Sequence, residues 1–115
     1  MNGQSPSAEL RFAPVTRFSE LREGRGRKVI LGDQEIALWR VGAAVYAISN
    51  VCAHQHFSRL HEGTREGLTV RCPMHGWRYS LQTGEAVEGN GRVRVFPVKI
   101  QNDIVLVGLA PDEGL

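Results

Sequence analysis

The sequence has few cysteines, no long hydrophobic run and little excess charge. Two cysteines in 115 residues are too few for a disulfide scaffold, and in a reducing compartment such a pair more often serves a metal or redox centre. No window approaches the roughly 18 consecutive apolar residues that a membrane-spanning helix needs. The polar first ten residues lack the apolar core and cleavage site of a secretory signal peptide. We therefore expect a soluble, cytoplasmic protein.

Charge and composition exclude other classes of protein. Fourteen basic residues stand against twelve acidic ones, and the net charge of +2 is too small to imply nucleic-acid binding. Hydrophobic residues make up 42% and charged residues 23%, as in ordinary globular domains. The length excludes a two-domain enzyme. We expect a flexible segment at residues 1–10, one domain over residues 11–110 and a short tail at residues 111–115.

Short apolar stretches separated by turn residues predict strands. Lys28–Leu31 and Glu35–Arg40 flank Gly32-Asp33, which is typical of a hairpin turn. Further strands are expected at Ala44–Ser49, at Arg92–Val95 before the strand-limiting Pro97, and in a second hairpin with Val98–Ile100, an Asn102-Asp103 turn and Ile104–Val107. Only Phe18–Glu23 suggests a helical turn. The pattern predicts an all-β fold, an antiparallel β-sandwich or small barrel.

All cysteines and histidines lie between Val51 and Leu81. They include two pairs separated by seventeen residues, Cys52-Ala53-His54 and Cys72-Pro73-Met74-His75. Thiolate and imidazole are ligands both for zinc and for iron–sulfur clusters, so the residues alone allow a tetrahedral ion or a two-iron centre. Pro73 and Gly76 favour a sharp turn that would direct the second pair inward.

The pattern Cys-x-His, seventeen residues, Cys-x-x-His-Gly-Trp resembles the Rieske [2Fe–2S] proteins. Similarity to Rieske-type ferredoxins extends from about Phe12 onward, through Asn50-Val51-Cys52, Arg78-Tyr79-Ser80, Thr83-Gly84-Glu85 and the closing valine-rich hairpin. The resemblance implies a Rieske-like fold with a cluster-binding subdomain of two loops at about residues 50–81. It also implies one [2Fe–2S] cluster, in which Cys52 and Cys72 bind one iron while His54 and His75 bind the other.

The same resemblance implies a soluble one-electron carrier between a flavoprotein reductase and a terminal oxygenase or related redox enzyme. Such a carrier would have no catalytic residues and no substrate chemistry of its own. A terminal oxygenase also needs a mononuclear iron bound by two histidines and a carboxylate. Only His56 and His61 would remain for that iron, and both lie in the first loop, so a self-contained oxygenase is excluded. Two alternatives stay open: the small subunit of an assimilatory nitrite reductase, and a zinc-stabilised interaction module.

Histidine ligation predicts a raised reduction potential. An oxidised centre with two thiolates and two neutral imidazoles carries no net charge, and Rieske potentials span about −150 to +300 mV, against about −400 mV in plant-type ferredoxins. High-potential relatives have a serine at the position of Trp77 and a disulfide at those of Phe57 and Met74, and this chain has neither. Tyr79 matches a tyrosine that can donate to a ligand sulfur. We expect a potential in the lower half of the Rieske range.

Three further features lie outside the ligand set. His56 stands where the ferredoxins usually place glycine, and we expect His56 and His61 to be loop residues bonded to backbone or water. Trp77 and Phe57 are expected to shield the cluster. The basic segment that contains Arg22, Arg25, Arg27 and Lys28 is interpreted as a solvated loop, with a docking patch for an acidic partner as the alternative.

Overall fold

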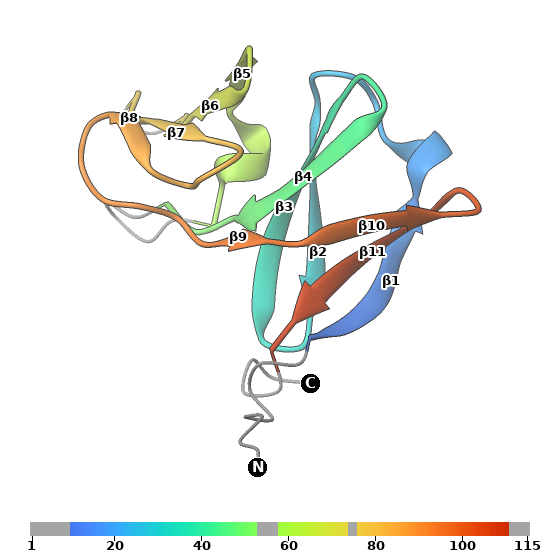
Figure 1. The fold of residues 1–115 in the computed structure, drawn as a ribbon. Helices are drawn as coiled ribbons and strands as arrows, with labels where there is room; N and C mark the ends of the chain where they lie inside the picture. Colours follow the sequence, from blue (N-terminus) through green and yellow to red (C-terminus); the bar gives the residue numbers. More distant parts are fainter. Residues whose placement is uncertain (1–9, 53–57, 74–75, 111–115) are drawn as a thin grey trace.

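The strands form three antiparallel sheets in the computed structural model, which describes residues 10–52, 58–73 and 76–110 (Figure 1). The first sheet has the order β1-β11-β10, with β1 at Arg11–Arg17, β11 at Ile104–Leu109 and β10 at Val98–Gln101. The second has the order β2-β3-β4-β9, with β2 at Gly26–Leu31, β3 at Gln34–Val41, β4 at Ala44–Ser49 and β9 at Val95–Phe96. The third has the order β5-β6-β7-β8, with β5 at Thr64–Glu66, β6 at Thr69–Arg71, β7 at Arg78–Ser80 and β8 at Ala86–Glu88. The all-β prediction is confirmed.

The only helical turns among the described residues are two 3₁₀ turns, η2 at Phe18–Glu20 and η3 at Leu60–Glu62. The first lies within the helical turn expected from the sequence, but it is shorter. None of the described segments is a helix with the length and apolar character needed to cross a membrane.

Both predicted hairpins are present. Gly32, with a φ of 60°, begins the turn between β2 and β3. Asn102 and Asp103 have φ values of 51° and 68° between β10 and β11. Asn and Asp tolerate this left-handed conformation better than other side chains, which is why they suit a tight hairpin.

Two strands differ from the expectation. Arg92–Val95 does not form a continuous strand, because Arg92 makes only an isolated bridge with Glu85 and the strand is β9, at Val95–Phe96. Pro97 ends β9, since proline has no N–H to donate. The sequence did not indicate β1, which contains Pro14. This strand lies at a sheet edge and carries a register shift between Pro14 and Thr16, where proline is tolerated.

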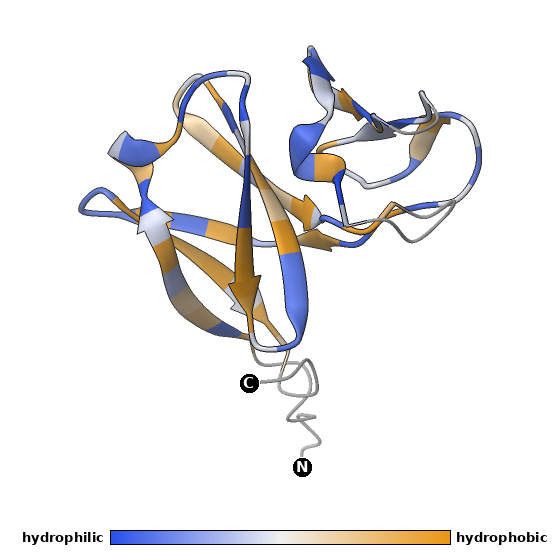
Figure 2. Ribbon diagram, turned by 180° about the vertical axis from the view of Figure 1, so that it is seen from behind, coloured by the Kyte–Doolittle hydropathy of each residue, from blue (hydrophilic) through white to orange (hydrophobic). Residues whose placement is uncertain are grey.

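The strand β3 is buried on both faces. Ile36 and Leu38 belong to a core shared with β11, whereas Ala37 and Trp39 belong to a second core that contains both cysteines. A strand covered on both faces has a continuous apolar run rather than an alternating one. Figure 2 shows hydrophobic residues along the strands of the first and second sheets.

The third sheet and η3 form a small lobe beside the first and second sheets (Figure 1). The lobe packs closely against β2 and β3, because a Cβ atom at Gly26 would collide with the carbonyl of His61 and the ring of Trp39. An ion pair of 2.8 Å between Glu23 and Arg65 joins the lobe to the segment before β2. The second core therefore lies between the β2–β3–β4 layer and the small lobe.

Candidate metal centre

The first cysteine, Cys52, lies three residues after the end of β4, at the start of a loop closed by Asn50. Val51 bridges to Ser58, which brings the ends of the loop together. Asn50 is fully buried, and its Nδ2 donates to the carbonyl of Ser58 at 2.7 Å. Its Oδ1 accepts from the backbone N–H of His61 at 2.6 Å and lies 3.1 Å from Nδ1 of the same residue. One amide side chain thus joins the end of β4 to both the far side of the loop and η3.

The second cysteine begins the connection between β6 and β7. The N–H of Cys72 donates to the carbonyl of Trp77 at 2.7 Å, and the N–H of Gly76 donates to the carbonyl of Cys72 at 3.1 Å. Gly76 has a φ of 75°, a conformation that glycine adopts without the clash a Cβ atom would cause. The turn expected at Pro73 and Gly76 is therefore confirmed at its described ends.

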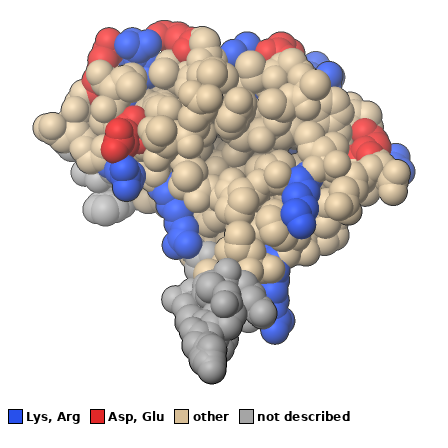
Figure 3. Space-filling model, viewed as in Figure 1, with Lys and Arg blue, Asp and Glu red and all other residues tan. Residues whose placement is uncertain are grey.

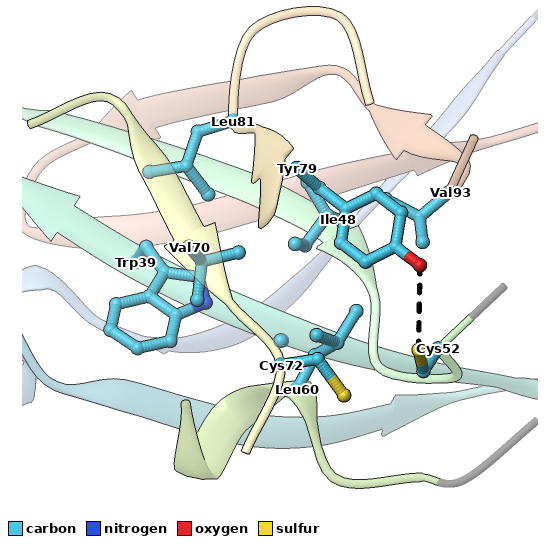
Figure 4. Packing of buried hydrophobic residues seen from close by; sticks show 10 residues of the cluster. Trp39, Ile48, Cys52, Leu60, Val70, Cys72, Tyr79, Leu81 and Val93 are labelled. Carbon is cyan, nitrogen blue, oxygen red and sulfur yellow. Dashed lines mark hydrogen bonds between the residues drawn. The ribbon is translucent and has the colours of Figure 1, made fainter. Parts of the chain in front are cut away.

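Both thiols lie in the same buried core. Cys52 is 0% and Cys72 is 2% exposed, and both pack with Tyr79, Val70 and Leu60. The Sγ atom of Cys52 lies 3.4 Å from the hydroxyl of Tyr79. Figure 4 shows the two sulfur atoms at one end of this core. Two buried sulfur donors from two different loops, with a hydroxyl directed at one of them, fit the thiolate side of an iron–sulfur centre.

The histidines of the predicted ligand set, His54 and His75, lie outside the described residues. The same holds for His56, and for Phe57, which was expected to shield the centre. Among residues 10–52, 58–73 and 76–110, no group of three or more His, Cys, Asp or Glu side chains could hold a metal ion. The structure thus brings together the two predicted cysteines and leaves the two histidines as a prediction.

His61 and Trp77 occupy places at the edge of the site. The ring of His61 bonds the side chain of Asn50, rather than the backbone or water that we expected, and its Nε2 lies 3.7 Å from Glu62. Trp77 is partly buried against the core that contains both cysteines. Its ring lies so close to the backbone of Gly89 that a Cβ atom there would overlap it. Trp77 thus packs against the core that contains both cysteines, and its expected role in shielding the cluster stays a prediction.

Four charged side chains form a network on the third sheet. Arg71 and Arg78 face each other across β6 and β7, and both bind Glu66 and Glu88 from the two edge strands. The hydrogen bond from Arg71 holds the pKa of Glu88 below its ordinary value. On the face drawn in Figure 3, acidic side chains likewise lie beside basic ones. No local pattern in the sequence predicts this network, because its four residues come from four different strands.

A second carboxylate with a lowered pKa, that of Glu35, lies near the first loop. Hydrogen bonding by Ser58, and then by Lys28, lowers the pKa of Glu35. The ammonium of Lys28 is 3.3 Å from Glu35, and Arg27 lies 3.8 Å from Glu20. Arg27 and Lys28 thus lie on β2 and are paired within the protein, so the expectation of a solvated loop is wrong for these two residues. The alternative, a docking patch that contains Arg22, Arg25, Arg27 and Lys28, stays a prediction.

Comparison with known families identifies this arrangement. The sequence profile of the Rieske [2Fe–2S] domain matches residues 11–99. The chain belongs to the Rieske [2Fe–2S] domain family. Rieske centres are bound by two cysteines and two histidines, and the two buried thiols fit that donor set. The protein accordingly binds a Rieske [2Fe–2S] cluster.

Relatives within the family include proteins named as ferredoxins. The ferredoxin component of the naphthalene 1,2-dioxygenase system of Pseudomonas putida is 30% identical over 103 residues, which cover 88% of this chain and 98% of that protein. A ferredoxin chain solved in complex with the reduced oxygenase of carbazole 1,9a-dioxygenase is similar in structure, with a TM-score of 0.76 and 31% identity over 83% of this chain and 99% of that chain.

The fold also occurs in proteins of another description. A putative NADH-dependent nitrite reductase small subunit from Mycobacterium tuberculosis gives a TM-score of 0.81 at 23% identity, covering 89% of this chain and 97% of that chain. At that identity the likeness shows a common fold alone. The Rieske fold is therefore established by both kinds of neighbour.

Proposed function

We propose that this protein is a Rieske-type ferredoxin that carries single electrons from a flavoprotein reductase to a terminal oxygenase or related redox enzyme in the cytoplasm. The observation that carries the proposal is the pair of buried thiols, Cys52 and Cys72, held at one end of the second core with the Tyr79 hydroxyl 3.4 Å from one sulfur. Relatives of similar length support the choice of partners, since the naphthalene system protein is named as its ferredoxin component.

In the proposed site, Cys52 and Cys72 bind one iron, and His54 and His75 bind the other. The bound cluster would supply a one-electron couple in the Rieske range of potentials. The chain's residues exclude water from the sulfur side through Leu60, Val70 and Tyr79, which pack with both cysteines. Asn50 fixes the first loop and the bonds at Cys72 fix the second, so the ligands would be held in place before an electron arrives.

Of the two alternatives, the nitrite reductase small subunit has only the shared fold in its favour. As a structural partner, it would not need two buried thiols from separate loops. A zinc-stabilised module would use the same four ligands but would be colourless. The metal content of the protein distinguishes all three functions.

The first test is the composition and redox activity of the anaerobically reconstituted protein. We expect about two irons and two sulfides per chain and a paramagnetic signal after reduction with dithionite. Reduction by a flavoprotein reductase and reoxidation by a terminal oxygenase, followed by stopped-flow absorption, would test the carrier role. One zinc per chain, or folded protein without metal, would contradict the proposal.

The ligand assignment is tested by comparing two loop histidines. His75→Ala should abolish cluster assembly, because it removes a proposed iron ligand. His56→Ala is the matched control, and we expect it to retain two irons and the visible spectrum. Retention of the cluster in His75→Ala would contradict the assignment of His75, and loss of the cluster in His56→Ala would contradict the expectation that His56 is not a ligand.

A further inference from the structure

The guanidinium of Arg71 lies at the junction between the charge network and the second cysteine loop. Its Nη1 donates to the carbonyl of Gly76 at 2.6 Å and to Glu88 at 2.8 Å. Its Nε and Nη2 each lie 3.3 Å from an oxygen of Glu66. One side chain therefore connects both edge strands of the third sheet to the far end of the loop that begins at Cys72.

We infer that Arg71 is a positioning residue for the cluster, holding the second loop in its ligand-binding shape through the Gly76 carbonyl. The inference rests on the proposed ligand set. The two backbone hydrogen bonds at Cys72 close the loop from within, and the bond from Arg71 holds it from outside. Because Gly76 follows directly after His75, a change at its carbonyl would alter the loop next to a proposed ligand.

Two carboxylates hold the guanidinium of Arg71 in position for this contact. Glu66 and Glu88 come from β5 and β8 and bind the guanidinium from two directions, so its position is fixed independently of the loop. A planar guanidinium can bind two carboxylates and a carbonyl at once in fixed directions. A lysine ammonium would keep the positive charge but could not reproduce the bonds to all three partners.

Arg78 provides a matched comparison within the same network. It is the cross-strand partner of Arg71, and its guanidinium lies 3.2 Å from Glu88 and 3.5 Å from Glu66. The two side chains are similarly exposed, at 33% for Arg71 and 27% for Arg78. Among the described residues, Arg78 makes no bond to the loop that follows Cys72. The two arginines thus share charge and carboxylate partners, and they differ in the bond to Gly76.

The test compares Arg71→Gln, Arg71→Lys and Arg78→Gln in the reconstituted holoprotein. Both glutamine variants remove one positive charge from the same sheet, so we expect both to lower the reduction potential. Removal of an outer-shell partner typically weakens metal binding by about 10–100-fold, so both Arg71 variants should lose the cluster roughly tenfold faster than wild type. They should also change the g-values of the reduced cluster, whereas Arg78→Gln should leave both the lifetime and the g-values close to wild type.

Arg71→Lys separates loop positioning from charge. It should keep the wild-type potential while still shortening the cluster lifetime. Equal lifetimes and g-values in Arg71→Gln and Arg78→Gln would overturn the inference, as would a normal lifetime in Arg71→Lys. A wild-type protein that binds no cluster would instead overturn the proposed function and this inference with it.

Discussion

The contact between Tyr79 and Cys52 shows how one residue can adjust the redox property of the site. Both side chains are fully buried, so their hydroxyl–sulfur contact of 3.4 Å is shielded from water. A phenolic O–H that donates to a thiolate withdraws electron density from the sulfur and favours the reduced, more negative centre. Tyr79 therefore acts through the proposed ligand Cys52.

Tyr79→Phe should lower the reduction potential by about 50 mV. A hydrogen bond to a charged group is worth roughly 1.5–3 kcal/mol, and part of that energy differs between the two redox states. A one-electron couple shifts by about 59 mV for each tenfold change in equilibrium constant. Redox titration of the holoprotein gives the measurement. Tyr46, the other tyrosine of the chain, packs against the same core. Tyr46→Phe is therefore the matched control and should leave the reduction potential unchanged. Equal potentials in Tyr79→Phe and wild type would refute this role for the hydroxyl.

Among the secondary-structure elements, β4 and η3 are joined by a single buried side chain. The amide nitrogen of Asn50 donates to the carbonyl of Ser58, and its amide oxygen accepts from the backbone N–H of His61. The backbone N–H of Asn50 donates to the carbonyl of Glu35 at 2.8 Å. A strand end, a loop and a 3₁₀ turn thus depend on one amide. The first loop is consequently fixed at both of its ends by hydrogen bonds of the chain itself.

Asn50→Ala should destabilise the protein by roughly 2–4 kcal/mol, because each buried polar partner left without a hydrogen bond costs about 1–3 kcal/mol. The free energy of unfolding can be measured by urea titration of the holoprotein, with cluster absorption recorded in parallel. Asn90→Ala, at an exposed position, serves as the control and should change stability little. A loss below about 0.5 kcal/mol in Asn50→Ala would contradict the role assigned to this amide.

The elements differ in how far the sequence could predict them. The hairpins at Gly32-Asp33 and Asn102-Asp103 were predictable, because their turn residues and flanking apolar runs are local signals. The strands β5 to β8 have three residues each and form through pairing with one another, which no short pattern reveals. Within the site, ligand chemistry and spacing identified both cysteines. The positions of Asn50 and Arg71 could not be predicted, since each depends on partners brought near by the fold.

At the scale of the whole molecule, the fold places one shared layer between two cores. The strands β3 and β4 contribute to both: Val45 and Ala47 lie in the core beneath β11, and Ile48 lies in the core with the cysteines. The cysteine core is thus covered by the β2–β3–β4 layer on one side and by the small lobe on the other. Loss of lobe packing would expose the sulfur side of the site, so the stability of the lobe bears directly on cluster retention.

The lobe should lose stability in acid in a way that depends on Glu88. The folded protein holds the pKa of Glu88 below its ordinary value of 4.5, chiefly through the hydrogen bond from Arg71. A lowered folded-state pKa stabilises the protein above the ordinary value, and this stabilisation is lost as the pH falls through the lowered one. At neutral pH, Glu88→Gln should therefore have the lower thermal unfolding midpoint, and the difference from wild type should shrink below about pH 4.5.

Thermal unfolding of both holoproteins between neutral pH and pH 3 measures this difference. Protonation of the metal ligands and of Glu35 affects both proteins alike, so the difference between them reports the charge network that contains Glu88. Because Glu88 is at the surface, added salt should reduce the neutral-pH difference by screening its pairs with Arg71 and Arg78. A difference that stayed constant into acid would show that Glu88 stabilises the lobe through packing, and its ion pairs would then have no measurable part in holding the second loop.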